Sequence, residues 1–558
     1  MDNMIQKVDS FIGKDLLDML MFSMYPDAKI IYREYVQNAF DSINSAVEEK
    51  VLNKVRDGIV SIKIDPIGRN ISIKDNGTGI PKDYALKILT SIADSQKDGV
   101  ERAGVYGIGR LVGAGYCSRL EFRTSSVGED VATIVNFDVD ATRSILDNKT
   151  DRRSATEVMN SIVSYQTIGE ATNEHYFEVI LHNVRKEYPI LLSEEDIIEY
   201  LKEVAPIDYE MPFKNNVMFS SFDEDNTFEQ LQKDLKYIKL SVNNQPDIRK
   251  RYSDTVVGTG DEIVTLQYFS LDDIQFGRLA WGWFAVTKFS KAIPASDPNR
   301  GIRLRKLNIQ VGEANYLNQY FDEARGNNYF YGEIHAVHPN LRPNTSRAGL
   351  TPTVEANILF RKLNEYFKQL KFIYNLANKA KTAVRDITQA TTKIGQQGLT
   401  EKEKKEAEAT LSLGKKKLES ATKSVTQQGS ATNPAAVKIL QQYQQQIIDS
   451  APAQPSVGII QSAGAPNITI TEPVSVVSAA GEGDTVIYAA DQHTLSSLQQ
   501  VPSASIPQDI FQPLVDKLPK EQVWIVRRIF KSLSDNCPKA HLSLIEDLKK
   551  LVIKDLEK

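Results

Sequence analysis

Two stretches decide the fold of this 558-residue chain: REYVQNAFD at residues 33–41 and NISIKDNGTGI at residues 70–80. In the first stretch, Glu34, Asn38 and Asp41 recur at spacings of four and three residues, which places them on one face of a helix. The second stretch begins as a strand of alternating apolar and polar residues and continues into a glycine-rich turn. A helix with two carboxylates and an amide therefore precedes a strand that ends in a carboxylate.

The turn after this strand contains Asp75, Gly77, Gly79 and Ile80 in the motif DNGTGI. Glycines allow a planar ring to approach the backbone closely, and a carboxylate at a strand end can accept a hydrogen bond from a nucleobase amine. A plain hairpin turn is the structural alternative for this motif. An ordinary salt-bridged surface helix is likewise the alternative for the acidic stripe that precedes it.

A third motif, GVYGIG, places Gly104, Gly107 and Gly109 before a short apolar run. Glycines at such a position free backbone N–H groups to bind phosphates at the start of a helix. The pattern is G-x-x-G-x-G, which differs from the Rossmann fingerprint, and the Walker A pattern is absent from the chain. The motif alone is weak evidence, but its order and spacing after the other two are informative.

Together the three motifs resemble the GHKL superfamily of ATP-binding proteins, which includes Hsp90 chaperones, MutL, type II topoisomerase subunits, MORC proteins and sensor histidine kinases. Residues 11–43 most resemble the opening of Hsp90, and TSIADSQK at 90–97 resembles the segment that begins its lid. Residues 301–311 and 329–350 resemble strands and the catalytic loop of the Hsp90 middle domain. The resemblance covers about residues 5–360.

This resemblance implies a Mg²⁺-dependent enzyme that hydrolyses ATP to ADP and phosphate. Glu34 would orient and activate the attacking water, and Arg347 would reach the γ-phosphate from the second domain. Asn344 and Ser346 would shape the Arg347 loop, Asp75 would accept from the adenine amine, and Asn38 would be the metal ligand. The residues implied to bind the nucleotide are Asn38, Asp41, Asp75, Gly77, Gly79, Ile80, Gly104, Gly107 and Gly109.

The chain also departs from the Hsp90 pattern. Only eleven residues separate Ile92 from Gly104, so the lid is shorter than in typical Hsp90 chaperones. A later Gly-Thr pair that would touch the nucleotide is not evident near residues 175–181. The C-terminal third shows neither a familiar Hsp90 dimerisation sequence nor an acidic tail, which leaves ATP-driven clamping as the expected activity.

The expected fold class is α+β: a GHKL (Bergerat) sandwich, an α+β middle domain, and a helical C-terminal region with a flexible linker. Strands are predicted at 59–64, 70–74, 119–124, 131–137, 176–181, 235–242, 262–269, 279–287 and 303–311. The expected divisions are 1–205 for the ATP-binding domain, 206–352 for the middle domain, 353–450 for long helices, 451–506 for the linker and 507–558 for a helical module.

Composition sets the broad class of the protein. Hydrophobic residues make up 41% and charged residues 25% of the chain, as in globular proteins, and the net charge is −5. Cys117 and Cys537 are far apart, which argues against a disulfide framework or a paired-cysteine metal site. The sequence contains no long apolar run and no apolar leader. We therefore expect a cytoplasmic protein with no membrane partner.

The expected function is that of an Hsp90-like, ATP-gated homodimeric clamp or chaperone that acts on a protein partner. A MutL- or MORC-like clamp on DNA is the alternative, and its sign would be a basic groove formed by Arg300, Arg303, Arg305 and Lys306. A strand with exposed charges would explain this cluster equally well. Three apolar stripes in residues 508–558 favour a self-associating helical module.

Overall fold

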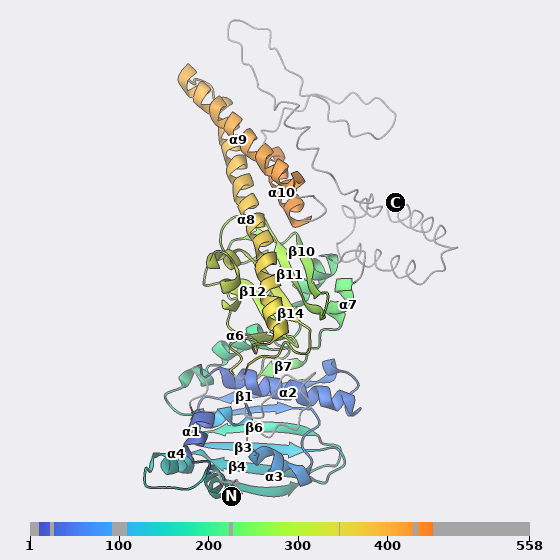
Figure 1. The fold of residues 1–558 in the computed structure, drawn as a ribbon, viewed down its shortest axis with the longest axis vertical. Helices are drawn as coiled ribbons and strands as arrows, with labels where there is room; N and C mark the ends of the chain where they lie inside the picture. The colour runs from blue at the N-terminus through green and yellow to red at the C-terminus, as the bar shows by residue number, and fades with distance from the viewer. Residues whose placement is uncertain are drawn as a thin grey trace, which may run out of the picture. The chain divides into compact units, whose positions relative to one another are not determined.

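The computed structural model describes residues 11–22, 27–91, 109–221, 227–344, 346–427 and 434–449. The chain divides into two compact units, residues 1–381 and residues 382–558. The first unit contains two large β-sheets. In Figure 1 the first appears in blue to cyan except for its green strand β7, and the second in green to yellow. The expected α+β class is confirmed, and the sheets define a first and a second domain within this unit.

The first sheet has seven strands in the order β5-β4-β3-β6-β2-β1-β7. Its members are β1 (Ile59–Asp65), β2 (Asn70–Asp75), β3 (Arg119–Ser125), β4 (Val131–Asp138), β5 (Val163–Gly169), β6 (Tyr176–His182) and β7 (Lys239–Val242). Neighbouring strands run antiparallel except β1 and β7, which are parallel. The alternating sequence of β2 puts Ile71 and Ile73 into the core, as a period of two requires.

Six helices accompany this sheet: α1 (Asp15–Phe22), α2 (Ile30–Glu48), α3 (Lys82–Thr90), α4 (Val139–Asp147), α5 (Ala155–Ile162) and α6 (Glu194–Val204). Helix α2 is buried over most of its length, and Ile31, Val36 and Ile43 belong to the same core as the sheet. Such extensive burial means that the polar residues of α2 must find partners inside the protein. This requirement bears directly on Glu34, Asn38 and Asp41.

Strand β7 joins the first sheet from a distant part of the sequence. It pairs in parallel with β1, and the side-chain oxygen of Asn243 accepts a hydrogen bond from the backbone N–H of Ile64 at 2.8 Å. Leu240 and Val242 are buried in the core of the first sheet. The chain therefore returns to this sheet after residue 205, the end predicted for the first domain. Parallel edge pairing across such a separation has no local sequence signal.

The second sheet has the order β10-β11-β14-β12-β13 and is mixed, with β12 and β14 parallel. Its strands are β10 (Thr265–Asp273), β11 (Gly277–Val286), β12 (Gly301–Lys306), β13 (Ile309–Val311) and β14 (Tyr331–Ala336). A small hairpin of β8 (Thr255–Val256) and β9 (Asp261–Glu262) and a short helix, α7 (Thr227–Lys233), complete this domain with several 3₁₀ turns. The aromatic core includes Tyr209, Phe213 and Trp283.

The single strand predicted at residues 303–311 is wrong, because this stretch forms the hairpin β12–β13. Leu307 and Asn308 have φ values of 51° and 64° and make the two-residue turn. Two consecutive positive φ values are typical of a type I′ turn, which usually contains glycine. Asn308 tolerates this backbone, and its buried amide donates to the carbonyl oxygens of Ile207 and Lys236. The turn was missed because its sequence, Leu-Asn, lacks the usual Asn-Gly signal.

Three long helices follow, as expected: α8 (Val354–Ile394), α9 (Glu401–Gln427) and α10 (Pro434–Asp449). In the first unit, α8 packs against the second domain through the stacked rings of Tyr366 and Phe269, whose centroids are 4.1 Å apart. In the second unit, Ile387 of α8 and Leu418 of α9 share a small core. No helix in the described part of the chain is long and apolar enough to cross a membrane. The expected linker 451–506 and the module 507–558 lie outside the described residues.

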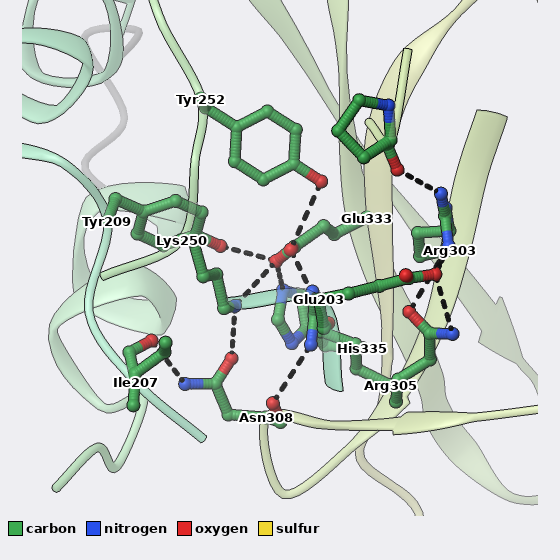
Figure 2. Close-up of polar contacts among 12 residues, drawn as sticks. Glu203, Ile207, Tyr209, Lys250, Tyr252, Arg303, Arg305, Asn308, Glu333 and His335 are labelled. Atoms are coloured by element: carbon green, nitrogen blue, oxygen red, sulfur yellow. Dashed lines mark hydrogen bonds and ion pairs between the residues drawn. The ribbon is translucent and has the colours of Figure 1, made fainter. Parts of the chain in front are cut away.

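A buried network of charged groups surrounds the carboxylate of Glu333 in the second sheet (Figure 2). The Nε atom of Arg305 lies 2.7 Å from one carboxylate oxygen, and the Nζ atom of Lys250 lies 3.0 Å from the other. The hydroxyl group of Tyr209 donates to the same carboxylate at 2.5 Å. Burial alone would raise the pKa of Glu333, but Arg305 and Lys250 hold it well below its usual value. The carboxylate is therefore ionised and fully paired.

The same network corrects the interpretation of the basic cluster at residues 300–306. Arg303, Arg305 and Lys306 are buried, and each makes polar contacts inside the protein. Arg303 pairs with Glu203 of α6, as Figure 2 shows. The three basic residues of β12 thus form neither a strand with exposed charges nor an open basic groove, whereas Arg300, before the strand, is partly exposed. The β12 sequence alternates apolar and basic residues, but both faces of this strand are covered.

Candidate functional site

The acidic stripe predicted on α2 is present and largely buried. Glu34 and Asp41 are 5% and 1% exposed, whereas Asn38 is partly exposed. The side chain of Asn38 makes no hydrogen bond to any residue that the structure describes. The stripe therefore contains two buried acids and, between them, an amide that is available to a ligand.

Asp75 lies where β2 ends, directly across the sheet from Phe177 of β6. Its carboxylate accepts hydrogen bonds from the backbone N–H of Gly77 at 2.8 Å, from Ser42 of α2 and from the backbone of Phe177. Burial outweighs these bonds and raises the pKa of Asp75 to about 7. A buried carboxylate with only neutral hydrogen-bond donors around it is stabilised by a further donor from a ligand.

The two glycines of DNGTGI are required by close backbone packing. Gly79 has a φ of 65°, and a Cβ atom at this position would lie 1.8 Å from the carbonyl oxygen of Ser125. A Cβ atom on Gly77 would lie 2.0 Å from the hydroxyl oxygen of Ser42. Ile80, which follows Gly79, donates its backbone N–H to the hydroxyl oxygen of Thr124 at 2.6 Å. The turn is therefore tied both to α2 and to β3, which fixes the position of Asp75.

The last glycine of GVYGIG lies beside the acidic stripe. A Cβ atom on Gly109 would come within 2.8 Å of the Oε2 atom of Glu34. The chain after Gly109 forms a 3₁₀ segment, Gly109–Tyr116, that is fixed by a hydrogen bond from the N–H of Gly113 to the hydroxyl oxygen of Tyr35. Gly104 and Gly107 lie outside the described residues. The structure thus brings one of the three predicted loop glycines to the site.

Arg347 reaches the first domain from the second, and its partner there is Glu34. The Nε atom of Arg347 lies 2.8 Å from the Oε1 atom of Glu34, and both side chains are buried. The neighbouring Arg33 places its own Nε atom 3.9 Å from the same oxygen. One carboxylate oxygen therefore faces two guanidinium groups, whereas the other lies near Gly109.

The loop that carries Arg347 is held in an unusual conformation. Arg347 has a φ of 55°, which non-glycine residues seldom adopt. Its N–H donates to the carbonyl oxygen of Asn344, and its own carbonyl oxygen accepts from the N–H of Gly312 at 2.8 Å. Ser346 donates to the side-chain oxygen of Asn344 at 3.3 Å. Such strain persists where surrounding contacts fix it, and it frequently marks functional sites.

The structure adds four residues to the site that the sequence patterns did not single out. Ser42 forms a hydrogen bond with the carboxylate of Asp75, and the hydroxyl oxygen of Thr124 accepts from the N–H of Ile80. Arg33 lies near the carboxylate of Glu34. The ring nitrogen Nδ1 of His175 donates to the carbonyl oxygen of Gly77 at 2.8 Å. Ser42 comes directly after the acidic stripe on α2 and Arg33 directly precedes Glu34, so position was their only available signal. The contacts of Thr124 and His175 join the turn to distant parts of the sequence.

A comparison with protein families finds a match within the first domain. Residues 30–168 match the family described as histidine kinase-, DNA gyrase B- and HSP90-like ATPase. This part of the chain is therefore similar to GHKL-type ATPases. The matched residues include the acidic helix α2, the DNGTGI turn and Gly109, and they end within β5 of the GHKL sheet.

Parts of the chain are similar to bacterial proteins named chaperone protein HtpG. The protein from Campylobacter jejuni (strain 81-176) is 25% identical over 201 residues, which are 32% of each chain. That from Mycolicibacterium vanbaalenii is 28% identical over 140 residues, 22% of each chain. That from Cupriavidus metallidurans is 32% identical over 114 residues, 17% of this chain and 18% of the relative. The matches thus span about a third or less of the length of these curated relatives.

The geometry of the GHKL site fits the ligands that the family implies. Asp75 offers a buried acceptor with a raised pKa, which suits the exocyclic amine of adenine. Asn38 offers an amide oxygen for Mg²⁺, which often takes one or two protein oxygens together with phosphates and water. In the described residues, no group of three or more His, Cys, Asp or Glu side chains could hold a metal ion.

Proposed function

We propose that this protein is a Mg²⁺-dependent ATPase of the Hsp90-like branch, whose catalytic groups come from two domains. The observation that carries this proposal is the 2.8 Å contact between Arg347 of the second domain and Glu34 of the GHKL domain. A histidine kinase-like domain would not require an arginine from a separate domain. The combination favours an enzyme in which hydrolysis depends on how the two domains are arranged.

In the proposed reaction, Asp75 binds the adenine amine and Asn38 provides the protein ligand of Mg²⁺. Bound Mg²⁺ would neutralise charge on the phosphates. Glu34 would orient the attacking water and accept its proton, which requires that its carboxylate be released from Arg347. Arg347 would then turn from this carboxylate to the γ-phosphate and stabilise the charge that develops there. The ion pair would thus represent the state before ATP is engaged.

A nucleotide-dependent exchange of partners by Arg347 would couple the ATPase cycle to movement of the second domain. We therefore propose an ATP-gated clamp that acts on a protein partner, as the similarity to HtpG chaperones suggests. The alternative of a DNA clamp depended on a basic groove at residues 300–306, and the burial of Arg303, Arg305 and Lys306 removes that support. An ATPase assay with and without DNA, combined with identification of co-purifying proteins, tests this choice.

The Asp75→Asn variant is expected to bind ATP about ten- to a hundredfold more weakly, because the amide presents a donor to the adenine amine. The raised pKa of Asp75 adds a pH dependence to the wild type. At pH 6 the carboxyl group is mostly protonated and at pH 8 mostly ionised, so ATP affinity should rise through neutral pH. Isothermal titration calorimetry at several pH values measures both effects.

The control for this prediction is Asp65→Asn, at the end of the neighbouring strand β1. Asp65 is exposed and accepts from the backbone N–H groups of Ile67 and Gly68, which an asparagine can also do. This variant should retain wild-type affinity and pH dependence. Because ATP itself titrates in this range, the informative quantity is the difference between wild type and Asp75→Asn. A constant difference from pH 6 to pH 8 would contradict the role of the Asp75 charge.

Self-association is expected to depend on residues 508–558, and we propose that the active form is a homodimer. A chain that ends at Ser450 should form smaller oligomers than the full chain, and light scattering measures their mass. ATP binding should persist, because the GHKL domain lies far from the removed segment in the sequence. An unchanged oligomeric state would transfer the proposed dimer contact to the helices of residues 355–449.

A further inference from the structure

A cavity of about 240 Å³ lies between α6 of the first domain and the edge of the second sheet. Its walls come from Glu203, the segment before β12, and the two 3₁₀ segments Tyr316–Tyr320 and Ala324–Tyr329 with their flanking residues. The volume is somewhat below the range typical of sites for drug-sized ligands. The cavity is distinct from the nucleotide site, because none of its lining residues belongs to the predicted ATP-binding set.

The two acidic residues of the lining are already engaged. Asp297 is buried, and its carboxylate accepts from the N–H groups of Gly258 and Asn299, each at 3.0 Å, and from the hydroxyl group of Tyr331. The carboxylate of Glu203 pairs with Arg303, as Figure 2 shows. Protein groups therefore occupy the acceptor oxygens of both carboxylates, and Arg303 also compensates the charge of Glu203.

Hydrogen-bond donors, in contrast, remain available around the cavity. Arg300 is partly exposed, and its guanidinium group forms no ion pair or hydrogen bond with any described residue. The side chains of Asn315 and Asn328 likewise make no hydrogen bond within the described ranges. The buried Nε atom of Arg303 also lacks a hydrogen-bond acceptor there. The lining thus offers one guanidinium group that has no ion pair among the described residues, and several unused N–H groups.

Asn318 adds a donor whose orientation is set by the network around it. The side-chain oxygen of Asn327 accepts from the N–H of Ile302 at 2.8 Å, so the amide nitrogen of Asn327 must face Asn318. This nitrogen donates to the side-chain oxygen of Asn318 at 2.8 Å. The oxygen of Asn318 is therefore used, and its amide nitrogen is left as a donor.

We propose that this cavity is a binding site for a small tetrahedral oxyanion, either free phosphate or a phosphate monoester. Arg300 supplies the charge, and the amides of Asn315, Asn318 and Asn328 supply donors from separate segments, a spread that suits a tetrahedral anion. The bound anion would touch α6 of the first domain and the edge of the second sheet at once. The proposal is independent of ATP hydrolysis, because it uses no residue of the nucleotide site.

Calorimetric titration of the full chain with inorganic phosphate, at constant ionic strength set by chloride, tests this site. We expect saturable binding to one site outside the GHKL domain, about tenfold or more weaker in Arg300→Ala. Asn315→Ala should weaken binding several-fold without a change in charge. Arg152→Ala removes an exposed arginine of the first domain that has no ion pair in the described chain, and it should leave phosphate binding unchanged.

Truncation of Arg300 should leave the fold intact, because Arg303 bonds the backbone carbonyl oxygen of Arg300 and not its side chain. Equal melting temperatures of Arg300→Ala and wild type would verify this. Sulfate should compete with phosphate for the site. A titration with glycerol phosphate separates the two ligand classes. Tighter binding of glycerol phosphate than of phosphate assigns the site to a monoester, and weaker binding assigns it to free phosphate. Equal phosphate affinity in Arg300→Ala and wild type would overturn the proposal. Competition with phosphate by acetate or glycine as strong as that by sulfate would overturn it as well.

Discussion

Replacement of Glu34 by alanine is expected to lower ATP turnover about 10²–10⁴-fold, the usual contribution of a positioned acid–base group. ATP binding should change much less, because Asp75 and the turn that holds it do not contact Glu34 in the described structure. Steady-state phosphate release measures turnover, and calorimetry measures affinity. The expected pattern is thus a loss of chemistry in a protein that still binds its substrate.

Glu34→Ala also leaves Arg33 and Arg347 buried without their shared carboxylate, which can destabilise the protein. The isosteric Glu34→Gln variant keeps a hydrogen-bond acceptor for Arg347 and should show a similar loss of turnover. Glu49→Ala, at the exposed end of the same helix, is the matched control and should hydrolyse ATP normally. Normal turnover in Glu34→Gln would exclude the proposed role as a base.

Arg347→Met is expected to slow turnover in the full chain by about 10³-fold, the lower end of what an arginine finger contributes. Methionine keeps much of the length of the side chain but removes its charge, so neither the ion pair with Glu34 nor a contact to the γ-phosphate can form. A pair of fluorophores, one on each domain, reports whether nucleotide-dependent closure weakens in parallel. We expect both quantities to fall together.

Arg342→Met provides the control in the same loop. Arg342 is partly exposed, and among the described residues its side chain makes only a 3.5 Å hydrogen bond, to the carbonyl oxygen of Pro339. Its substitution should alter neither turnover nor closure. If turnover falls in Arg347→Met while closure is intact, Arg347 acts only on the chemistry. If neither changes, the contact with Glu34 is structural, and the proposed two-domain active site is wrong.

The elements that depend on local pattern were predictable from the sequence. The spacing of Glu34, Asn38 and Asp41 was sufficient to place them on one helical face, and the alternation of NISIK indicated a strand that ends at Asp75. Both patterns reflect the geometry of a single element. The approach of Arg347 to the first domain was expected only through the resemblance to Hsp90, which implied a contact to the γ-phosphate. Its ion pair with Glu34 was not predicted, because no local rule joins residues from separate domains.

The features that were missed depend on distant packing or on unusual turns. The hairpin at Leu307 and Asn308 has no glycine, and the return of β7 to the first sheet requires parallel pairing over a long separation. The basic residues of β12 are buried because acidic partners, Glu203 and Glu333, come from other elements. A sequence shows that such charges are present, but their partners become evident only in the folded chain.

The return of β7 determines how the two domains of the first unit can move. The chain passes from the first core to the second near Tyr209, comes back before Leu240, and leaves again before Tyr252. Repeated covalent crossings between the two cores resist torsion, whereas a single linker would permit free rotation. We therefore expect the two domains to open and close about a single bending axis along the β7 edge of the first sheet. Arg347 would then return to Glu34 along the same path in every proposed ATPase cycle.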